Sequence, residues 1–356
     1  MKIKRLFILL CMIVLLSFMS TMFLYGPILN SGQVTQHQEP LLESHYLVEK
    51  KRAQVVLMTF RRSGSTFTGE LFGNNMRSFY LFEPLHFLRF FNKRPVDPGY
   101  IKNVSRSTLE AILSCQFTKL PFHTIWYHDF PDYMCYYGSV LRNTSFCSST
   151  RQPISAIYRE MNNRCKQSDF VAIKTIRLFK IKHLERFAVT PGTNLKVIHL
   201  VRDPRGTINS NKRHFRTSVS NITSLSRDLC NFIATTRQRV KDKSIWNGGS
   251  RYMELKYEDL SLNPLKISKQ IYDFIGFNLP NEIVTWIGKN TNVTNFSNGS
   301  MVVAKDSKTV PFAWRQTMNL QDVLDVQAVC EPVMKQLGYR LVKTENDLRD
   351  TELNLM

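Results

Sequence analysis

Five short, mostly apolar runs are distributed along this chain of 356 residues, and segments with helical spacing of apolar positions lie between them. Apolar runs of this length are typical of strands that are buried on both faces of a sheet. The predicted strands comprise residues 53–60, 79–82, 170–176, 195–201 and 251–256. The predicted helices comprise residues 66–75, 105–117, 222–241, 264–275 and 321–337. This alternation predicts an α/β fold in which helices flank a parallel sheet.

The N-terminal residues have a different pattern. An uncharged apolar run over residues 6–25 follows Lys2, Lys4 and Arg5. At a rise of about 1.5 Å per residue the run is about 30 Å long, enough to span a bilayer, and the preceding basic residues favour a cytosolic N-terminus. A cleaved signal peptide is the alternative, although such peptides have a shorter apolar core. The expected organisation is a cytosolic tail 1–5, a transmembrane signal-anchor 6–25, a polar stem 26–52, a luminal domain 53–345 and a C-terminal tail 346–356.

Cysteines and glycosylation signals indicate the compartment. Cys11 lies in the apolar run, and the remaining six cysteines form an even number that suits disulfides, although the sequence favours no particular pairing. None has the C-x-x-C spacing of a zinc site, and no metal is expected. Residues 120–168 look irregular and contain Cys135, Cys147 and Cys165, so we expect a disulfide-pinned insertion there. N-glycosylation triplets begin at Asn103, Asn143, Asn221, Asn292, Asn295 and Asn298, which predicts a chain of the secretory pathway.

Charge narrows the range of partners. The chain has 48 Lys and Arg against 28 Asp and Glu, and its formal net charge of +20 becomes +17 without the three basic residues of the predicted cytosolic tail. A field of this sign attracts anions. Because a luminal domain does not meet nucleic acid, the expected partners are an anionic nucleotide and an anionic glycan. A basic surface with no particular partner is the alternative.

A strand, a Gly/Ser turn and a helix start meet at residues 61–67, Arg-Arg-Ser-Gly-Ser-Thr-Phe. Main-chain N–H groups converge in such a turn, and the helix N-terminus adds partial positive charge, so the segment predicts an anion site. It is not a Walker A loop, because Ser65 occupies the lysine position and no glycine lies five residues before Gly64. The basic residue instead precedes the glycine, at Arg62.

A second candidate segment follows the predicted strand 195–201. Asp203 suits a helix N-cap and Pro204 a first helical residue, so residues 206–214 are expected to be helical. Arg202 then lies at the carboxyl end of the strand and Ser210 on the following helix, an arrangement that suits a terminal phosphate. The alternative makes Arg202 and Asp203 a surface ion pair and Ser210 an ordinary helix residue.

Together the two segments resemble the 5′-phosphosulfate and 3′-phosphate segments of the Golgi carbohydrate 6-O-sulfotransferases, which use 3′-phosphoadenosine 5′-phosphosulfate (PAPS). The resemblance extends over nearly the whole predicted luminal domain, with similar segments at residues 79–86, 171–177, 257–264, 313–315 and 336–339. It is strongest to the keratan and chondroitin branches of this family. Two departures are Thr66, where members often have a second serine, and a shorter 120–168 insertion. The insertion leaves the acceptor open, because such insertions usually shape an acceptor site.

The resemblance implies a sulfotransferase fold with a P-loop-like sheet. It also implies transfer of a sulfuryl group from PAPS to the 6-hydroxyl of galactose, N-acetylgalactosamine or N-acetylglucosamine, by a type II protein of the Golgi membrane with a luminal catalytic domain. Arg62 is expected to meet charge on the oxygen that bridges sulfur and the 5′-phosphate. The implied cofactor-binding residues are Arg61, Arg62, Ser63, Gly64, Ser65, Thr66, Phe67, Arg202, Asp203, Pro204, Arg205, Ser210, Trp314 and Arg315.

The base that takes the proton of the acceptor hydroxyl is expected to be Glu83, with His86 as the second candidate. A structural ion pair between Glu83 and a neighbouring arginine is the alternative. Lys174 and Arg177 can bind cofactor or acceptor, or cover surface. Trp314 can stack near the nucleotide or belong to the core.

Two other functional classes compete with the transferase. A P-loop nucleotide kinase is disfavoured by the missing lysine and by the luminal setting. A membrane-tethered protein that binds anionic glycans without catalysis would use the basic surface alone. Binding of adenosine 3′,5′-bisphosphate (PAP) distinguishes the enzyme from such a protein.

Overall fold

The computed structural model describes residues 51–88, 97–120, 147, 153–178, 180–215, 221–246, 249–292 and 306–356. The described residues all belong to one compact unit, Lys50–Met356. The predicted cytosolic tail and transmembrane segment therefore lie outside the described residues, as does almost all of the predicted stem. Within the described ranges, no helix has both the length and the apolar character needed to cross a bilayer.

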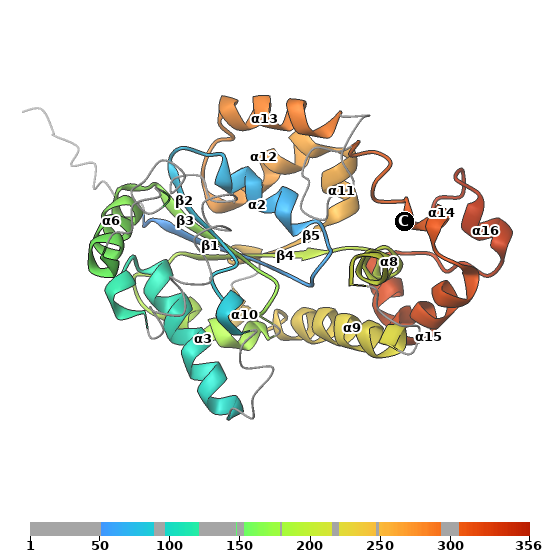
Figure 1. Ribbon diagram of the computed structural model, residues 1–356, viewed down its shortest axis with the longest axis horizontal. Helices are drawn as coiled ribbons and strands as arrows, with labels where there is room; N and C mark the ends of the chain where they lie inside the picture. The colour runs from blue at the N-terminus through green and yellow to red at the C-terminus, as the bar shows by residue number, and fades with distance from the viewer. Residues whose placement is uncertain are drawn as a thin grey trace, which may run out of the picture. The chain divides into compact units, whose positions relative to one another are not determined.

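A five-stranded parallel sheet forms the centre of this unit, as predicted (Figure 1). Each boundary lies within one residue of its prediction. The strands are β1 (Ala53–Thr59), β2 (Ser78–Phe82), β3 (Phe170–Thr175), β4 (Leu195–Val201) and β5 (Tyr252–Lys256), in the order β2-β3-β1-β4-β5. Val56 at the middle of β1 pairs with Ile173 on one side and Val197 on the other. Because all strands are parallel, the segments that follow β1, β2, β3 and β4 begin at the same edge of the sheet.

Strands β1 to β4 are buried on both faces of the sheet, which explains their mostly apolar runs, whereas β5 is only partly buried. Val55 and Leu57 of β1 belong to one apolar cluster, and Val56 and Met58 belong to the other. The Val55 cluster includes helices α2 (Ser65–Gly73), α11 (Tyr257–Leu262), α12 (Pro264–Ile275) and α13 (Asn281–Thr291). The Val56 cluster includes α3 (Pro98–Leu113), α6 (Ile154–Gln167), α7 (Glu185–Val189), α9 (Ile222–Arg239), α10 (Lys243–Trp246) and α15 (Leu320–Leu337). Figure 1 shows α12 and α13 on one side of the sheet and α3 and α9 on the other.

The helices differ from the prediction in two places, at the ends of α3 and at residues 154–167. Helix α3 begins at Pro98 rather than at residue 105, because the carboxylate of Asp97 accepts the N–H of Tyr100 at 2.7 Å and caps the helix. It ends at Leu113, shortly before Cys115, whose φ of 52° is incompatible with a continuing helix. Residues 154–167, predicted to be irregular, form α6. Its apolar face is narrow: Ile157, Met161 and Cys165 recur every four residues and are buried.

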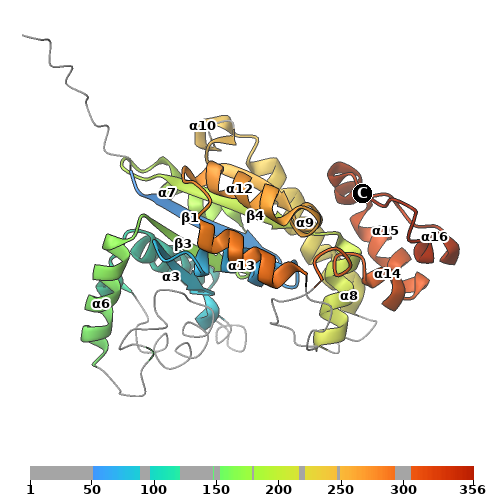
Figure 2. The same ribbon diagram turned by 90° about the horizontal axis from the view of Figure 1, so that it is seen from above.

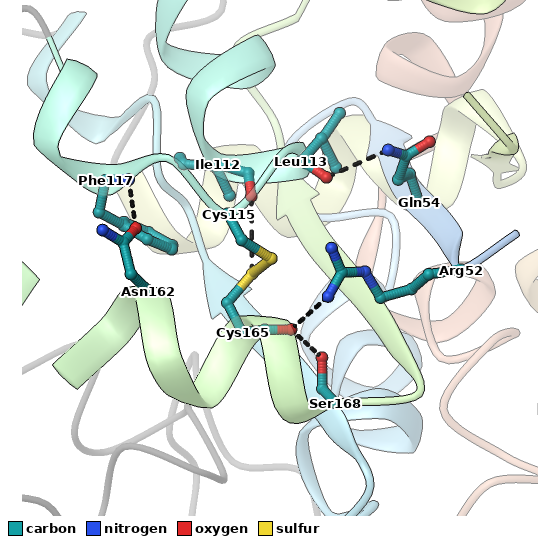
Figure 3. The surroundings of a disulfide bond; sticks show 9 residues. All are labelled: Arg52, Gln54, Ile112, Leu113, Cys115, Phe117, Asn162, Cys165 and Ser168. Atoms are coloured by element: carbon teal, nitrogen blue, oxygen red, sulfur yellow. Dashed lines mark hydrogen bonds between the residues drawn. A yellow bond between two sulfur atoms is a disulfide. The ribbon is translucent and has the colours of Figure 1, made fainter. Parts of the chain in front are cut away.

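Disulfides tie the helices of the Val56 cluster together. Cys115 bonds Cys165, and Cys230 on α9 bonds Cys330 on α15. Cys147 is also disulfide-bonded, whereas Cys135 lies outside the described residues. The main-chain oxygen of Cys165 accepts from Arg52 Nη1 at 2.8 Å and from Ser168 Oγ at 2.7 Å (Figure 3). The expected pinning of the 120–168 segment is thus confirmed at Cys165.

The C-terminal residues pack onto the domain rather than forming a separate tail. Leu348 of α16 (Glu345–Arg349) and Leu355 are buried, and the N–H of Arg340 donates to the oxygen of Leu355 at 3.0 Å. Figure 2 shows α16 near α14 (Trp314–Thr317) and α15, with α8 (Pro204–Phe215) beside them. This end of the unit therefore lies next to the helix that follows β4.

Candidate active site

The loop between β1 and α2 has two residues with a left-handed backbone, since φ is 69° at Arg62 and 91° at Gly64. Gly64 is the N-cap of α2. A Cβ atom at Gly64 would lie 2.1 Å from Cδ2 of Tyr257, so the positive φ and the close contact both require glycine. The main chain of the loop therefore lies directly against the ring of Tyr257.

Helix α2 begins after this loop without a side-chain cap and without an acidic residue in its first turn. The N–H groups and the dipole of such a helix end favour a bound anion. Ser63 and Ser65 are buried and Thr66 is half-buried. The ring of Phe67 packs 5.4 Å from that of Trp286, so only the main chain of Phe67 is suited to an anion. The geometry matches the anion cradle that the sequence predicted for residues 61–67.

The two predicted phosphate segments lie together. Nε of Arg62 donates to Oγ of Ser210 on α8 at 3.1 Å, and Nη1 of Arg202 donates to the main-chain oxygen of Arg62 at 3.2 Å. Burial lowers the pKa of Arg62, and the positive charge of Arg202 lowers it further. Two guanidinium groups whose charges affect each other in this way are favourable where an anion balances them. Arg61 has a different neighbour from Arg62 and Arg202, because its guanidinium lies 5.0 Å over the ring of Phe215.

Arg202 is held at the carboxyl end of β4 by several groups. Its guanidinium lies 4.8 Å over the ring of Tyr257, and Nη2 is 3.4 Å from the oxygen of Val310. A Cβ atom at Gly206 would lie 3.1 Å from its Nε, so the start of α8 approaches it closely. Among the described residues, this buried Nε has no hydrogen-bond partner. Nε is thus a buried donor that a bound phosphate oxygen would satisfy.

Asp203 and Arg205 have structural partners, which corrects their expected role at the cofactor. Asp203 caps α8, as predicted, by accepting the N–H of Arg205 at 2.9 Å. Nη2 of Arg205 lies 2.7 Å from Oδ2 of Asp203, and Nη1 donates to Gln327 at 3.0 Å. The Arg205 side chain is 0% exposed. The alternative of an Arg202–Asp203 surface pair is also wrong, since Asp203 pairs with Arg205 inside the protein. Pro204 is the first residue of α8, as predicted.

Trp314 and Arg315 are buried as well, and the ring of Trp314 lies beside the start of α8, since a Cβ atom at Gly206 would be 3.0 Å from its Cδ1. The ring of Trp314 lies 4.6 Å from the guanidinium of Arg205. Arg315 donates to the main-chain oxygens of Leu348 at 3.1 Å and Leu353 at 3.0 Å. The alternative of a core tryptophan therefore describes Trp314 better, and Arg315 anchors the C-terminal residues.

Glu83 lies at the same edge of the sheet, directly after β2. Its carboxylate is buried, 2.5 Å from Nζ of Lys174 and 3.7 Å from Nη1 of Arg177. Burial lowers the pKa of Lys174, and the charge of Glu83 opposes this shift. The expected alternative of an ion pair is thus present, with lysine as the nearer partner. His86 follows in the same turn, where its N–H donates to the oxygen of Glu83 at 2.9 Å.

Tyr257 and Glu258 had no role assigned from the sequence, although their segment was part of the resemblance. Tyr257 contacts both Gly64 and Arg202. Glu258 accepts the N–H of Asp203 at 3.0 Å and the hydroxyl of Tyr339 at 2.8 Å. Burial raises the pKa of Glu258, and the nearby charge of Asp203 raises it further. The similarity of residues 257–264 to the family was the available signal, but only the tertiary structure shows what Tyr257 and Glu258 contact.

Comparison with known proteins identifies the family of this domain. Residues 52–338 match the family model of the sulfotransferase domain. The chain is 28% identical to carbohydrate sulfotransferase 1 of Homo sapiens, covering 86% of this chain and 84% of that protein. It is 29% identical to carbohydrate sulfotransferase 3 of Mus musculus, covering 89% of this chain and 76% of that protein.

Two solved structures were also matched. The sulfotransferase domain from the curacin biosynthetic pathway gives a TM-score of 0.47 at 16% identity, covering 82% of this chain and 99% of that one. Mouse sulfotransferase SULT7A1 complexed with PAP gives 0.39 at 11% identity, covering 84% and 88%. The match of the family model over residues 52–338 and the similarity to curated relatives lead to one conclusion. This chain belongs to the sulfotransferase family, and the curated relatives that it resembles are carbohydrate sulfotransferases.

Proposed function

We propose that this protein transfers a sulfuryl group from PAPS to the 6-hydroxyl of galactose, N-acetylgalactosamine or N-acetylglucosamine in a glycan. The observation that supports this most is the contact of Arg62 with Ser210 and Arg202 beside the N-terminus of α2. It joins an anion-binding loop to a second basic segment, as a ligand with phosphates at both ends would need. A P-loop kinase is less consistent, because the loop has Ser65 where such an enzyme has lysine.

PAPS, when bound, supplies an activated sulfuryl group whose departure leaves charge on a 5′-phosphate oxygen. In our proposal the uncapped start of α2 and the guanidinium of Arg62 bind that end of the molecule and stabilise the developing charge. Arg202 holds the 3′-phosphate through Nε, the donor that lacks a partner among the described residues. Ser210 orients Arg62 through its hydroxyl.

Glu83 takes the proton of the acceptor hydroxyl in this scheme. It lies at the same edge of the sheet as the β1–α2 loop, and Lys174 holds its carboxylate at 2.5 Å. Lys174 thereby fixes the direction in which the carboxylate can accept a proton. His86, in the turn that Glu83 begins, is the second candidate for the base.

We further propose that the enzyme works in the Golgi lumen on keratan- or chondroitin-type acceptors. Supporting features are the disulfides and three sequon residues, Asn103, Asn221 and Asn292, whose side chains are exposed. The other three sequons, at Asn143, Asn295 and Asn298, lie outside the described residues. The proposed membrane anchor at residues 6–25 is tested by carbonate extraction of membranes from cells that express the whole chain.

The central test is transfer of radiolabelled sulfate from PAPS to keratan, chondroitin and GlcNAc-terminated acceptors, followed by disaccharide analysis. We expect label on the 6-position of galactose or N-acetylgalactosamine. Transfer to sulfated polymer should also fall more steeply with salt, because the Debye length shortens from about 10 Å at 0.1 M to about 3 Å at 1 M. Product only on terminal GlcNAc would overturn the acceptor class. Absence of transfer together with absence of PAP binding would overturn the enzyme.

A further inference from the structure

A cluster of basic side chains lies on the face of the sheet opposite α12 and α13. Lys102 and Arg106 are one turn apart on α3, which belongs to the Val56 cluster. Lys180, Lys182 and His183 belong to the 3-10 helix η4 (Ile181–Leu184) and the residue before it. The three lysines are exposed, and Arg106 and His183 are half-buried. We call these five residues the α3–η4 surface.

Helix α3 contacts η4, so the basic side chains of the two elements lie in one region, and four of them are close enough to affect His183. Burial lowers the pKa of His183, and the charges of Lys102, Lys180, Arg106 and Lys182 lower it further. The acidic neighbour Glu110 lies 4.0 Å from Nε of Arg106. An exposed ion pair at this distance contributes little free energy, and it does not neutralise the charges of the three lysines. The α3–η4 surface therefore presents a concentrated positive charge to solvent.

The η4 part of this surface is only a few residues away in sequence from Arg177, which lies at the candidate active site. Arg177, at the end of β3, is 3.7 Å from the carboxylate of Glu83. Lys180 follows three residues later and His183 six residues later, and fully extended chains of those lengths span at most about 11 Å and 22 Å. A polymer with one unit at Glu83 can therefore reach the α3–η4 surface with its neighbouring units.

The charge of the α3–η4 surface is spread over two elements, α3 and η4. Sulfate esters and uronates place negative charge on successive units of a glycan, so basic groups spread in this way suit an anionic polymer better than a simple ion.

We propose that the α3–η4 surface is a docking surface for the chain of an anionic polymeric acceptor, outside the site where sulfate is transferred. This inference rests on the proposed glycan sulfotransferase function and adds how a long acceptor is distinguished from a short one. Charge attraction at a distance from the reacting hydroxyl raises the fraction of enzyme that has polymer bound, without changing the chemical step.

The test compares Lys102→Ala/Lys182→Ala with a matched control, Lys266→Ala/Lys289→Ala, which removes two exposed lysines from α12 and α13. Both variants are made in an Asn103→Gln background, because a glycan at Asn103 on α3 would border the surface. The first measurement is the salt concentration that elutes each protein from immobilised chondroitin sulfate. The second is KM and kcat for long chondroitin sulfate chains and for a chondroitin tetrasaccharide.

We expect Lys102→Ala/Lys182→Ala to elute at lower salt and to raise KM for the long chains roughly five- to tenfold, with kcat and the tetrasaccharide KM unchanged. The control should behave as the parent does. Equal elution and equal KM for the two variants would overturn the docking surface. If the parent transfers no sulfate, the proposed function fails, and the elution measurement still decides the docking surface.

Discussion

Nε of Arg62 donates to Oγ of Ser210 at 3.1 Å, across 148 positions of sequence. The main-chain oxygen of the same arginine accepts from Nη1 of Arg202 at 3.2 Å. The β1–α2 loop is therefore fixed at both its side chain and its main chain by the segment that follows β4. Substitutions in that segment are expected to act partly through Arg62.

Arg62→Ala should reduce turnover by about 10²- to 10³-fold, because one preorganised charge contact at a developing oxyanion contributes roughly 3 to 4 kcal/mol. Arg62→Lys should recover only part of the activity, since an ammonium group cannot bind two oxygens as a guanidinium does. The measurement is kcat for sulfate transfer, with thermal unfolding as the control for folding. A folded Arg62→Ala protein with near-normal turnover would exclude the proposed role of this residue.

Arg202→Ala should raise KM for PAPS more than it lowers kcat, whereas Ser210→Ala should have a smaller effect, part of it on kcat through Arg62. The arginine variant loses a charged contact with phosphate and also the bond to the Arg62 oxygen. The serine variant loses only an orienting contact. Calorimetric binding of PAP provides a readout that does not depend on transfer. Unchanged PAP affinity in both variants would show that this segment does not bind the 3′-phosphate.

Glu83→Gln should lower turnover by about 10²-fold or more while PAP affinity stays within a few-fold of the parent. The same substitution leaves the buried ammonium of Lys174 without its partner at 2.5 Å, so stability should fall by about 3–5 kcal/mol. Both quantities are measured on one preparation, by initial rates and by urea unfolding.

A double variant separates these two effects of Glu83. Glu83→Gln/Lys174→Gln removes both charges and should regain much of the lost stability, but not the turnover. Recovery of turnover in the double variant would assign Glu83 a structural role alone. Loss of turnover in His86→Ala with an active Glu83→Gln would assign the base to His86.

His199 gives a prediction for pH. It is buried on β4, its Nδ1 lies 2.8 Å from the hydroxyl of Tyr252, and burial lowers its pKa to about 3 from 6.5. Between these two pH values the unfolded chain binds a proton that the folded protein excludes. The contribution of neutral His199 to the free energy of unfolding is therefore present above pH 6.5 and is lost as the pH falls. At pH 5.5 the loss is about 1.4 kcal/mol relative to pH 7.5.

His199→Gln lacks this titration, so its free energy of unfolding should fall less between pH 7.5 and 5.5, by about the same 1.4 kcal/mol. Urea unfolding of the parent and the variant at both pH values measures the difference. Equal changes in the two proteins would show that His199 is accessible to protons in the folded state.

The sequence specified the sheet well, because a strand buried on both faces must be apolar along its whole length. The positions of β1 to β4 follow from that requirement, whereas β5 is only partly buried and contains Glu254 and Lys256. Helix α6 was missed for the opposite reason. It buries only a narrow face, through residues such as Ile157 and Met161, while polar residues occupy most of its other positions. Its packing against the rest of the domain, including the Cys115–Cys165 bond, decides its structure.

The sequence by itself also determined the β1–α2 loop, because its chemistry is local: a glycine with positive φ, hydroxyls and a helix start are adjacent in the chain. Only the tertiary structure decided which basic residues serve that loop. Arg202 lies against Arg62, whereas Arg205, three residues later, is buried against Asp203 and Gln327. Gln327 is 122 positions away in sequence, and partners at that distance leave no periodic or local signal. The direction of each arginine is therefore set by packing between elements, which a short motif does not encode.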